Sequence, residues 1–94
     1  MNPLAMNTAP VVLITGATKG IGRAIAERFA ETASELHVVA RNQEDLNAMK
    51  SALERPGLSV AVYCADLSKP EEVSALVVML QAQLPRLDVL VNNA

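Results

Sequence analysis

Short apolar runs alternate along the chain with longer segments of mixed character. The runs consist mainly of Val, Ile, Leu and Ala, so they predict strands that are buried on both faces of a sheet. The longer segments place apolar residues three or four positions apart, which predicts amphipathic helices. The expected strands are 11–15, 36–40, 58–64 and 87–91.

Each expected helix has one apolar face, which should pack against the sheet. The first face comprises Ile21, Ile25, Phe29 and Ala33, with Ala26 and Ala30 beside them. The second face comprises Leu46, Met49 and Leu53. The third face comprises Val73, Leu76, Val77, Leu80 and Leu84.

The ends of the second and third helices carry separate sequence signals. Asn42 can cap the second helix, and the Pro-Gly pair that begins at Pro56 should end it. Ser68 is the expected N-cap of the third helix, and Glu71, three residues later, would complete a capping box. Pro85 should end the third helix, because proline cannot continue it.

The predicted order of elements is strand–helix–strand–helix–strand–helix–strand. Such alternation predicts an α/β fold with a parallel sheet and right-handed crossovers. A chain of 94 residues has room for one domain at most. We expect this domain to occupy residues 11–94 and to follow a loose tail of residues 1–10.

Composition and charge exclude several classes of function. The net charge is −2, so the chain has no basic field for the phosphates of a nucleic acid. No apolar run approaches the roughly 18 residues of a membrane span. The first ten residues contain no basic region and no long apolar region, so we expect no signal peptide. We therefore expect a cytoplasmic protein with no membrane or nucleic-acid partner. The single cysteine, Cys64, lies in an apolar run and should be a small buried residue.

A glycine-rich stretch, GATKGIG, joins the first strand to the first helix. The first N–H groups of a helix lack intrahelical partners and carry the positive end of its dipole, so they can bind a phosphate. Gly16, Gly20 and Gly22 permit a tight turn and a close approach of ligand to backbone. Thr18 adds a hydroxyl and Lys19 a cation. The alternative is a glycine-rich turn that binds no ligand.

Three motifs at strand ends together resemble the short-chain dehydrogenase/reductase family. Residues 15–22, TGATKGIG, look like the cofactor motif of that family. An Asp-Leu pair after the third strand resembles the position that contacts adenine, and the final Asn-Asn-Ala resembles the start of the family's Asn-Asn-Ala-Gly motif. The resemblance extends over residues 11–94 and implies the first four strands of a Rossmann-like, doubly wound parallel sheet.

The resemblance implies a role in dinucleotide binding for each motif. Asp66 and Leu67 would hold the adenine, although Asp66 taken alone could be an ordinary acid at the start of a helix. Asn92 would tie the fourth strand to its neighbour, and the backbone of Asn92, Asn93 and Ala94 would line the adenosine ribose. The residues that would frame the pyrophosphate are Gly16, Gly20, Ile21 and Gly22.

The end of the second strand indicates which dinucleotide is preferred. A carboxylate at this point would accept hydrogen bonds from the free 2′-hydroxyl of NAD, but the sequence places Arg41 and Asn42 there. A guanidinium suits a phosphate group, and Lys19 would point to the same phosphate. We therefore predict NADP(H) as the cofactor, with NAD(H) disfavoured. The alternative is that Arg41 and Lys19 are solvated surface charges.

The catalytic residues of the resembled family have no counterpart in this sequence. The resemblance implies that carbonyl reduction uses a tyrosine as general acid, helped by a lysine four residues later and by an upstream serine. The only tyrosine is Tyr63, inside the third strand, and Leu67 stands four residues later. His37 lies in the second strand, with no acid or thiol placed to partner it. We therefore assign no catalytic residue and no metal ligand.

Two hypotheses of function follow. In the first, the chain is a fragment, the NADP(H)-binding portion of an oxidoreductase that transfers hydride between nicotinamide and an alcohol or carbonyl substrate. It would be inactive alone and homo-oligomeric when complete. In the second, it is a non-catalytic truncated or split nucleotide-binding module. In either case the fourth strand would be an open edge near Val78 and Met79, so we expect marginal stability or association.

Overall fold

The computed structural model describes residues 9–93 and has the order of strands and helices that the sequence predicts. The strands are β1 Val11–Thr15, β2 Glu35–Ala40, β3 Ser59–Cys64 and β4 Val89–Asn92. The helices are α1 Gly20–Phe29, α2 Gln43–Leu53 and α3 Pro70–Gln83. Most of the expected tail, residues 1–8, and the predicted site residue Ala94 lie outside the described residues.

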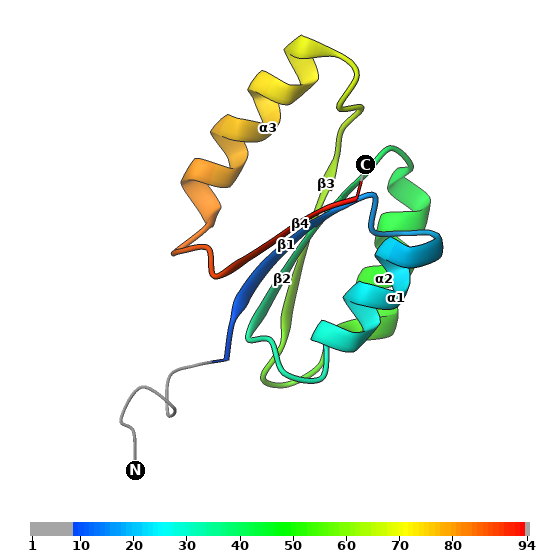
Figure 1. Ribbon diagram of the computed structural model, residues 1–94, viewed down its shortest axis with the longest axis vertical. Coiled ribbons are helices and arrows are strands. Elements are labelled where there is room, and N and C mark those ends of the chain that lie inside the picture. Colours follow the sequence, from blue (N-terminus) through cyan, green and yellow to red (C-terminus); the bar gives the residue numbers. More distant parts are fainter. Residues whose placement is uncertain (1–8, 94) are drawn as a thin grey trace.

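The four strands form one parallel sheet in the order β3-β2-β1-β4. Val12 of β1 lies opposite Leu36 of β2 on one side and Val89 of β4 on the other. Helices α1 and α2 cover one face of the sheet, and α3 lies over the opposite face (Figure 1). Strand order reverses between β1 and β4, which is the topological switch point of a doubly wound sheet. The predicted Rossmann-like α/β fold, with four strands, is confirmed.

Most of the apolar core lies between the sheet and the layer formed by α1 and α2. The fully buried side chains of this layer include Val12, Ile14, Leu36, Leu46 and Met49. The opposite face of the sheet carries a smaller cluster, which comprises Leu13, Val39, Tyr63, Ala65 and Leu76. Within α3 only Leu76 is buried. Helix α3 is therefore held by less apolar contact than α1 and α2.

Two of the predicted apolar faces are partly wrong. Ile21 is 72% exposed, because α1 turns the small residues Gly22 and Ala26 toward the core instead. Val77 is 45% exposed, because burial on α3 is centred on Leu76. The spacing of apolar residues gives the width of a helix face, but it does not decide which of two adjacent rows touches the sheet.

The prediction that Cys64 is buried is wrong. Cys64 is the last residue of β3, which lies at an edge of the sheet, and its side chain is exposed. Its Sγ donates a hydrogen bond of 3.3 Å to the backbone carbonyl of Arg41. Alternation along the strand places Cys64 on the opposite face from Tyr63, and its position as the last residue of an edge strand leaves it exposed there.

The two predicted helix caps have different outcomes. Asn42 caps α2 as expected, because its Oδ1 accepts a hydrogen bond of 3.0 Å from the N–H of Asp45. Ser68 does not cap α3, so the predicted capping box is wrong. The N-cap position of α3 is Lys69, which makes no side-chain capping bond, and the hydroxyl of Ser68 donates instead to Asp66. The Ser68 side chain is thus turned toward the Asp66 carboxylate, within its own turn, and away from the N–H groups of α3.

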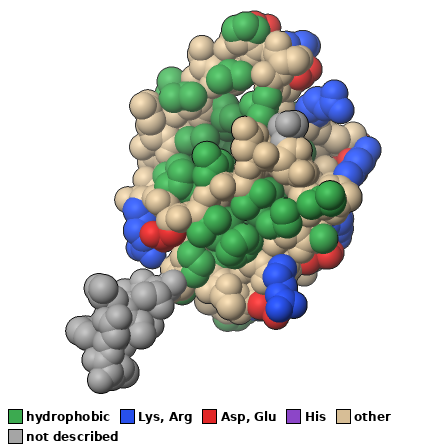
Figure 2. Space-filling view, in the orientation of Figure 1, with side chains coloured by type: hydrophobic (Ala, Val, Ile, Leu, Met, Phe, Trp, Pro, Cys, Tyr) green, Lys and Arg blue, Asp and Glu red, His purple; other side chains and the backbone are tan. Residues whose placement is uncertain are grey.

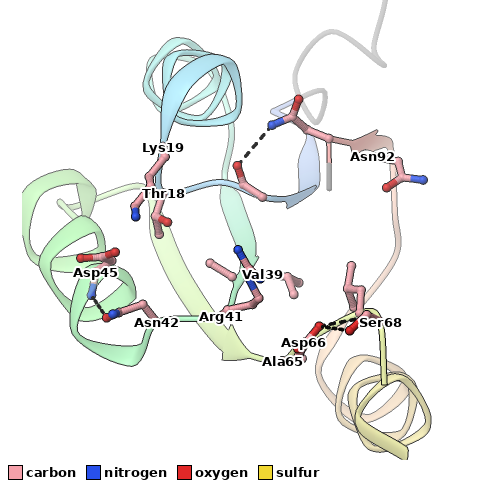
Figure 3. A pocket seen from close by; sticks show the side chains of 14 residues that line it. Thr18, Lys19, Val39, Arg41, Asn42, Asp45, Ala65, Asp66, Ser68 and Asn92 are labelled. Atoms are coloured by element: carbon pink, nitrogen blue, oxygen red, sulfur yellow. Dashed lines mark hydrogen bonds between the residues drawn. The ribbon is translucent and has the colours of Figure 1, made fainter. Parts of the chain in front are cut away.

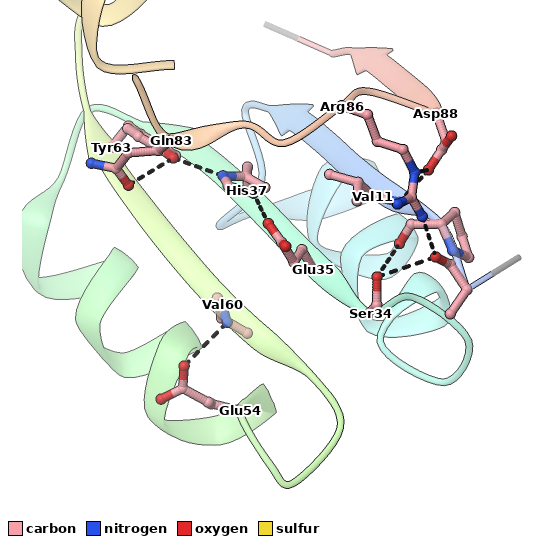
Figure 4. Close-up of polar contacts among 12 residues, drawn as sticks. Val11, Ser34, Glu35, His37, Glu54, Val60, Tyr63, Gln83, Arg86 and Asp88 are labelled. Atoms are coloured by element: carbon pink, nitrogen blue, oxygen red, sulfur yellow. Dashed lines mark hydrogen bonds and ion pairs between the residues drawn. The ribbon is translucent and has the colours of Figure 1, made fainter. Parts of the chain in front are cut away.

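A chain of polar side chains, with His37 and Tyr63 buried at its centre, links the sheet to α3 (Figure 4). Nδ1 of His37 lies 2.7 Å from the hydroxyl of Tyr63, and Nε2 lies 2.8 Å from Oε1 of Glu35. The Tyr63 hydroxyl also lies 3.3 Å from Oε1 of Gln83 at the end of α3. Burial, with the nearby Glu35 charge, raises the pKa of Tyr63. The expectation that no acid partners His37 is wrong, since Glu35 stands two positions earlier on the same face of β2.

A second polar cluster joins the beginnings of β1 and β4 (Figure 4). The N–H of Val11 donates to Oδ2 of Asp88 at 2.8 Å, and the N–H of Asp88 donates to the carbonyl of Val11 at 3.0 Å. Nε of Arg86 donates to the same carboxylate oxygen at 2.9 Å. The Val11 N–H and then Arg86 lower the pKa of Asp88. These contacts fix the register of β4 against the centre of the sheet.

Strand β4 forms one edge of the sheet and carries exposed apolar side chains. Leu90 is 57% exposed, and Val78 on α3 is 66% exposed. In Figure 2, which has the orientation of Figure 1, hydrophobic side chains form a band that runs parallel to β4. The part of the chain that the structure describes contains no helix long and apolar enough to cross a membrane.

Candidate functional site

A cavity of about 980 Å³ lies at the carboxyl ends of the four strands (Figure 3). Open α/β sheets bind ligands at this position, beside the switch point. Segments that follow each of the four strands contribute to its wall. The lining residues are Gly16, Thr18, Lys19, Val39, Ala40, Arg41, Asn42, Asp45, Ala65, Asp66, Leu67, Ser68, Asn92 and Asn93.

Backbone packing explains two of the glycines between β1 and α1. A Cβ on Gly22 would lie 2.0 Å from the carbonyl oxygen of Gly16, which is far inside van der Waals contact. A Cβ on Gly16 would lie 3.0 Å from the carbonyl oxygen of Asn93, and its φ of +63° also favours glycine. The turn therefore passes close to α1 and to the end of β4, and it leaves the backbone of Gly16 at the cavity wall.

The N-terminus of α1 faces this turn without a negative partner of its own. Its N-cap residue, Lys19, makes no side-chain capping bond, and its first turn contains no acidic residue. By contrast, Asn42 caps α2, and the first turns of both α2 and α3 contain acidic residues. The positive end of the α1 dipole is thus left for an anionic group from outside the chain.

A polar clasp joins the end of β1 to the end of β4. The Thr15 hydroxyl donates to Oδ1 of Asn92 at 3.1 Å and accepts a hydrogen bond from the N–H of Asn93 at 3.0 Å. Nδ2 of Asn93 donates to the carbonyl of Gly16 at 3.3 Å. The contact that was expected between Asn92 and the neighbouring strand is therefore present. The clasp positions both asparagines at the cavity.

Cationic side chains lie at the part of the cavity formed by the first turn and the end of β2. Lys19 and Arg41 both line the cavity, and Figure 3 shows their side chains directed toward its interior. Asn42 and Asp45 line it as well, joined by the capping bond of α2. This region therefore holds two cations against one carboxylate.

The segment after β3 supplies a second carboxylate. Oδ1 of Asp66 accepts hydrogen bonds from the Ser68 hydroxyl at 2.7 Å and from the Ser68 N–H at 2.9 Å. These two bonds hold the pKa of Asp66 below its ordinary value of 3.8, with smaller contributions from the Lys69 and Arg41 charges. Asp66 is thus an ionised hydrogen-bond acceptor at neutral pH.

The structure brings together most of the residues that the sequence suggested for a site. Those that line the cavity are Gly16, Thr18, Lys19, Arg41, Asn42, Asp66, Leu67, Asn92 and Asn93. Gly20, Ile21 and Gly22 do not line it; they form the first turn of α1, and the Ile21 side chain points to solvent. Residues 9–93 contain no cluster of three or more His, Cys, Asp or Glu side chains that could hold a metal ion.

Sequence reasoning missed two polar residues of the cavity. The sequence suggested no site role for Asp45, and it suggested Ser68 only as a helix cap. A signal for Asp45 was its place three residues after Asn42, because the capping turn brings these positions together. A signal for Ser68 was its place two residues after Asp66, the spacing at which an Asp side chain meets a nearby backbone N–H.

The parallel sheet, its switch point and the glycine turn at an uncapped helix define an α/β protein of the dinucleotide-binding class. A model of the short chain dehydrogenase family matches residues 10–94. The chain belongs to this family, whose members are oxidoreductases.

Curated relatives extend well beyond the matched region. The chain is 40% identical to a 3beta-hydroxysteroid dehydrogenase of Mediterraneibacter gnavus over 89% of this chain and 30% of that protein. It is 38% identical to a fatty acyl-CoA reductase of Acinetobacter baylyi over 89% of this chain and 28% of that protein. The chain thus spans about a third of the length of the curated relatives that it matches.

Solved structures agree with the fold. The L-sorbose reductase of Gluconobacter frateurii, complexed with NADPH and L-sorbose, superposes with a TM-score of 0.82 at 37% identity, over 92% of this chain and 33% of that chain. A short-chain dehydrogenase of Sphingobium yanoikuyae in complex with NADPH gives a TM-score of 0.80 at 41% identity, over 90% of this chain and 34% of that chain.

Proposed function

We propose that this chain is the NADP(H)-binding portion of a short-chain oxidoreductase. The observation that carries the proposal is the pair of cations, Lys19 and Arg41, in a cavity that also borders the uncapped N-terminus of α1. No carboxylate stands at the end of β2, where one would accept hydrogen bonds from the 2′-hydroxyl of NAD. Several similar structures are complexes with NADPH or NADP, which supports the same choice.

The residues of the cavity fit the parts of this dinucleotide. The α1 N-terminus, with Gly16 and the turn to Gly22, would receive the pyrophosphate through backbone N–H groups. Arg41 and Lys19 would bind the 2′-phosphate through charge-assisted hydrogen bonds, with Asn42 beside them. The ends of β1 and β4, joined by the asparagine clasp, would border the adenosine ribose.

The adenine would lie against the segment after β3. The base presents a donor, its 6-amino group, beside an acceptor, N1. Asp66 offers a carboxylate acceptor, and the N–H of Leu67 makes no hydrogen bond within residues 9–93. An acceptor followed by a donor is complementary to this edge of adenine.

The activity of a whole protein would need residues outside this chain. Bound NADP(H) supplies or accepts the hydride, and the substrate would be an alcohol or a carbonyl compound. Tyr63, the one tyrosine, is buried in β3 and bonded to His37, so it is not available as a catalytic acid. We expect no turnover from the 94-residue chain, and a cytoplasmic homo-oligomer for a complete enzyme.

The proposal is tested by titrating the full chain with NADPH and with NADH, followed by nicotinamide fluorescence. We expect NADPH to bind about 10-fold more tightly or better, because each bond between a charged donor and the 2′-phosphate stabilises only that complex. Arg41→Ala should remove most of this preference by weakening NADPH, while the affinity for NADH stays the same.

Arg28→Ala is the matched control for Arg41→Ala. Arg28 is an exposed arginine in the last turn of α1, away from the cavity. Its loss changes the net charge by the same amount, so a general electrostatic effect would appear in both variants. Equal affinities for NADPH and NADH in the unmodified chain would overturn the choice of cofactor.

A further inference from the structure

The turn between β3 and α3 holds the Asp66 carboxylate in one orientation at the cavity wall. Both hydrogen bonds from Ser68 go to the same oxygen, Oδ1, at 2.7 Å from the hydroxyl and 2.9 Å from the N–H. Within residues 9–93 no hydrogen bond engages Oδ2. A carboxylate has acceptor sites on both oxygens, so Ser68 occupies one oxygen and leaves the other for a ligand.

The shape of this turn does not depend on the Ser68 hydroxyl alone. The N–H of Asp66 donates to Oε1 of Glu72 at 2.8 Å, and the N–H of Lys69 donates to the carbonyl of Asp66 at 3.1 Å. These contacts connect the turn to α3 without the serine side chain. The hydroxyl of Ser68 therefore acts chiefly on the carboxylate. Figure 3 shows the Ser68–Asp66 pair across the cavity from Thr18 and Lys19.

We infer that Ser68 is a positioning residue for base recognition, which holds Asp66 so that its free oxygen accepts the 6-amino group of adenine. The inference rests on the proposed function. A purine with a keto group at C6 presents an acceptor to Asp66 and a donor to the Leu67 N–H, so both contacts become unfavourable. Ser68 thereby helps to discriminate adenine from hypoxanthine.

The test compares NADPH with its deamino analogue, in which hypoxanthine replaces adenine. Dissociation constants for both are measured with the full chain and with Ser68→Ala. We expect the unmodified chain to prefer NADPH by about 10-fold, and Ser68→Ala to lower the affinity for NADPH about 3- to 5-fold. The affinity for the deamino analogue should not change. The preference for NADPH therefore falls.

Two further variants separate positioning from a merely structural role. Ser68→Thr keeps the hydroxyl donor and should keep the preference, while Ser74→Ala, at an exposed position on α3, should behave as the unmodified chain. A uniform loss of affinity for both nucleotides in Ser68→Ala, or an unchanged ratio, would overturn the role of Ser68. No binding of either nucleotide by the unmodified chain would overturn the proposed function itself.

Discussion

At the scale of single residues, the glycines between β1 and α1 meet two different physical demands. Gly20 has a φ of +56° and nothing within 4 Å of where a Cβ would lie, so it is needed for its backbone conformation. Gly22 is an ordinary helical residue whose missing Cβ lets α1 approach the Gly16 carbonyl. One motif thus combines a conformational glycine with a packing glycine.

This difference predicts unequal costs for alanine at the two positions. Gly20→Ala should lower the free energy of unfolding by about 1 kcal/mol, the cost of a left-handed conformation for a residue with a Cβ. Gly22→Ala should lower it by about 2–3 kcal/mol, because backbone must shift to relieve the overlap. Urea unfolding followed by circular dichroism measures both. Equal losses would contradict the packing role of Gly22.

The motif residues could be predicted from sequence because local backbone requirements select them. The glycines of the turn and the arginine at the end of the second strand each lie in one short segment, where the sequence alone reveals them. The pairing of Ser68 with Asp66 was missed because a serine beside a helix can bond in two directions. The burial of Cys64 was mispredicted because an apolar run does not reveal that β3 lies at an edge.

At the scale of elements, the polar chain from Glu35 through His37 and Tyr63 to Gln83 joins β2, β3 and α3. Helix α3 buries little apolar surface, so this chain is a substantial part of what connects it to the sheet. These polar contacts connect residues as far apart in sequence as 35 and 83, and neither the segment around His37 nor the segment around Tyr63 predicts that the two side chains meet. Only the β3-β2 pairing, which brings Val39 beside Tyr63, places the histidine within reach.

Tyr63→Phe tests the contribution of this chain. Tyr63 is 3% exposed, so removal of its hydroxyl leaves Nδ1 of His37 buried without its partner. The free energy of unfolding should fall by about 1–3 kcal/mol. Gln83→Ala removes only the exposed last member of these polar contacts, so it should change the free energy of unfolding by less than about 0.5 kcal/mol. A near-neutral Tyr63→Phe would show that water replaces the phenol.

The order of the elements was predictable because helix and strand periodicities differ, and because proline or glycine marks several of the boundaries. The doubly wound parallel sheet followed from the resemblance, whereas the strand order β3-β2-β1-β4 comes from the structure. The choice of buried row on α1 and α3 could not be predicted, because small residues such as Gly22 and Ala26 allow close packing that an apolar scale does not reward.

At the scale of the whole molecule, the two faces of the sheet differ in how fully they are covered. The α1–α2 layer encloses the larger core, whereas α3 and the β4 edge leave apolar side chains exposed. An edge strand also presents unpaired backbone groups, which can pair with another chain. The side of the molecule formed by α3 and β4 therefore combines exposed apolar side chains with unpaired backbone groups.

This asymmetry predicts concentration-dependent association of the chain. Size-exclusion chromatography with light scattering should detect species larger than the monomer, and Leu90→Lys combined with Val78→Lys should reduce them, since charge on an edge opposes pairing. Ile21→Lys is the control, because Ile21 is 72% exposed but lies on α1 over the other face. A monomeric elution profile together with a sharp cooperative melt would contradict this prediction.

The clasp of Thr15 with Asn92 has a consequence for the time course of synthesis. The two residues are 77 positions apart, while β1, β2 and β3 pair in sequence order. As the chain leaves the ribosome, these three strands can assemble with α1 and α2 before β4 exists. The last wall of the cavity then closes only when β4 docks beside β1. If a nascent chain binds the nucleotide, its β4 has therefore already been synthesised.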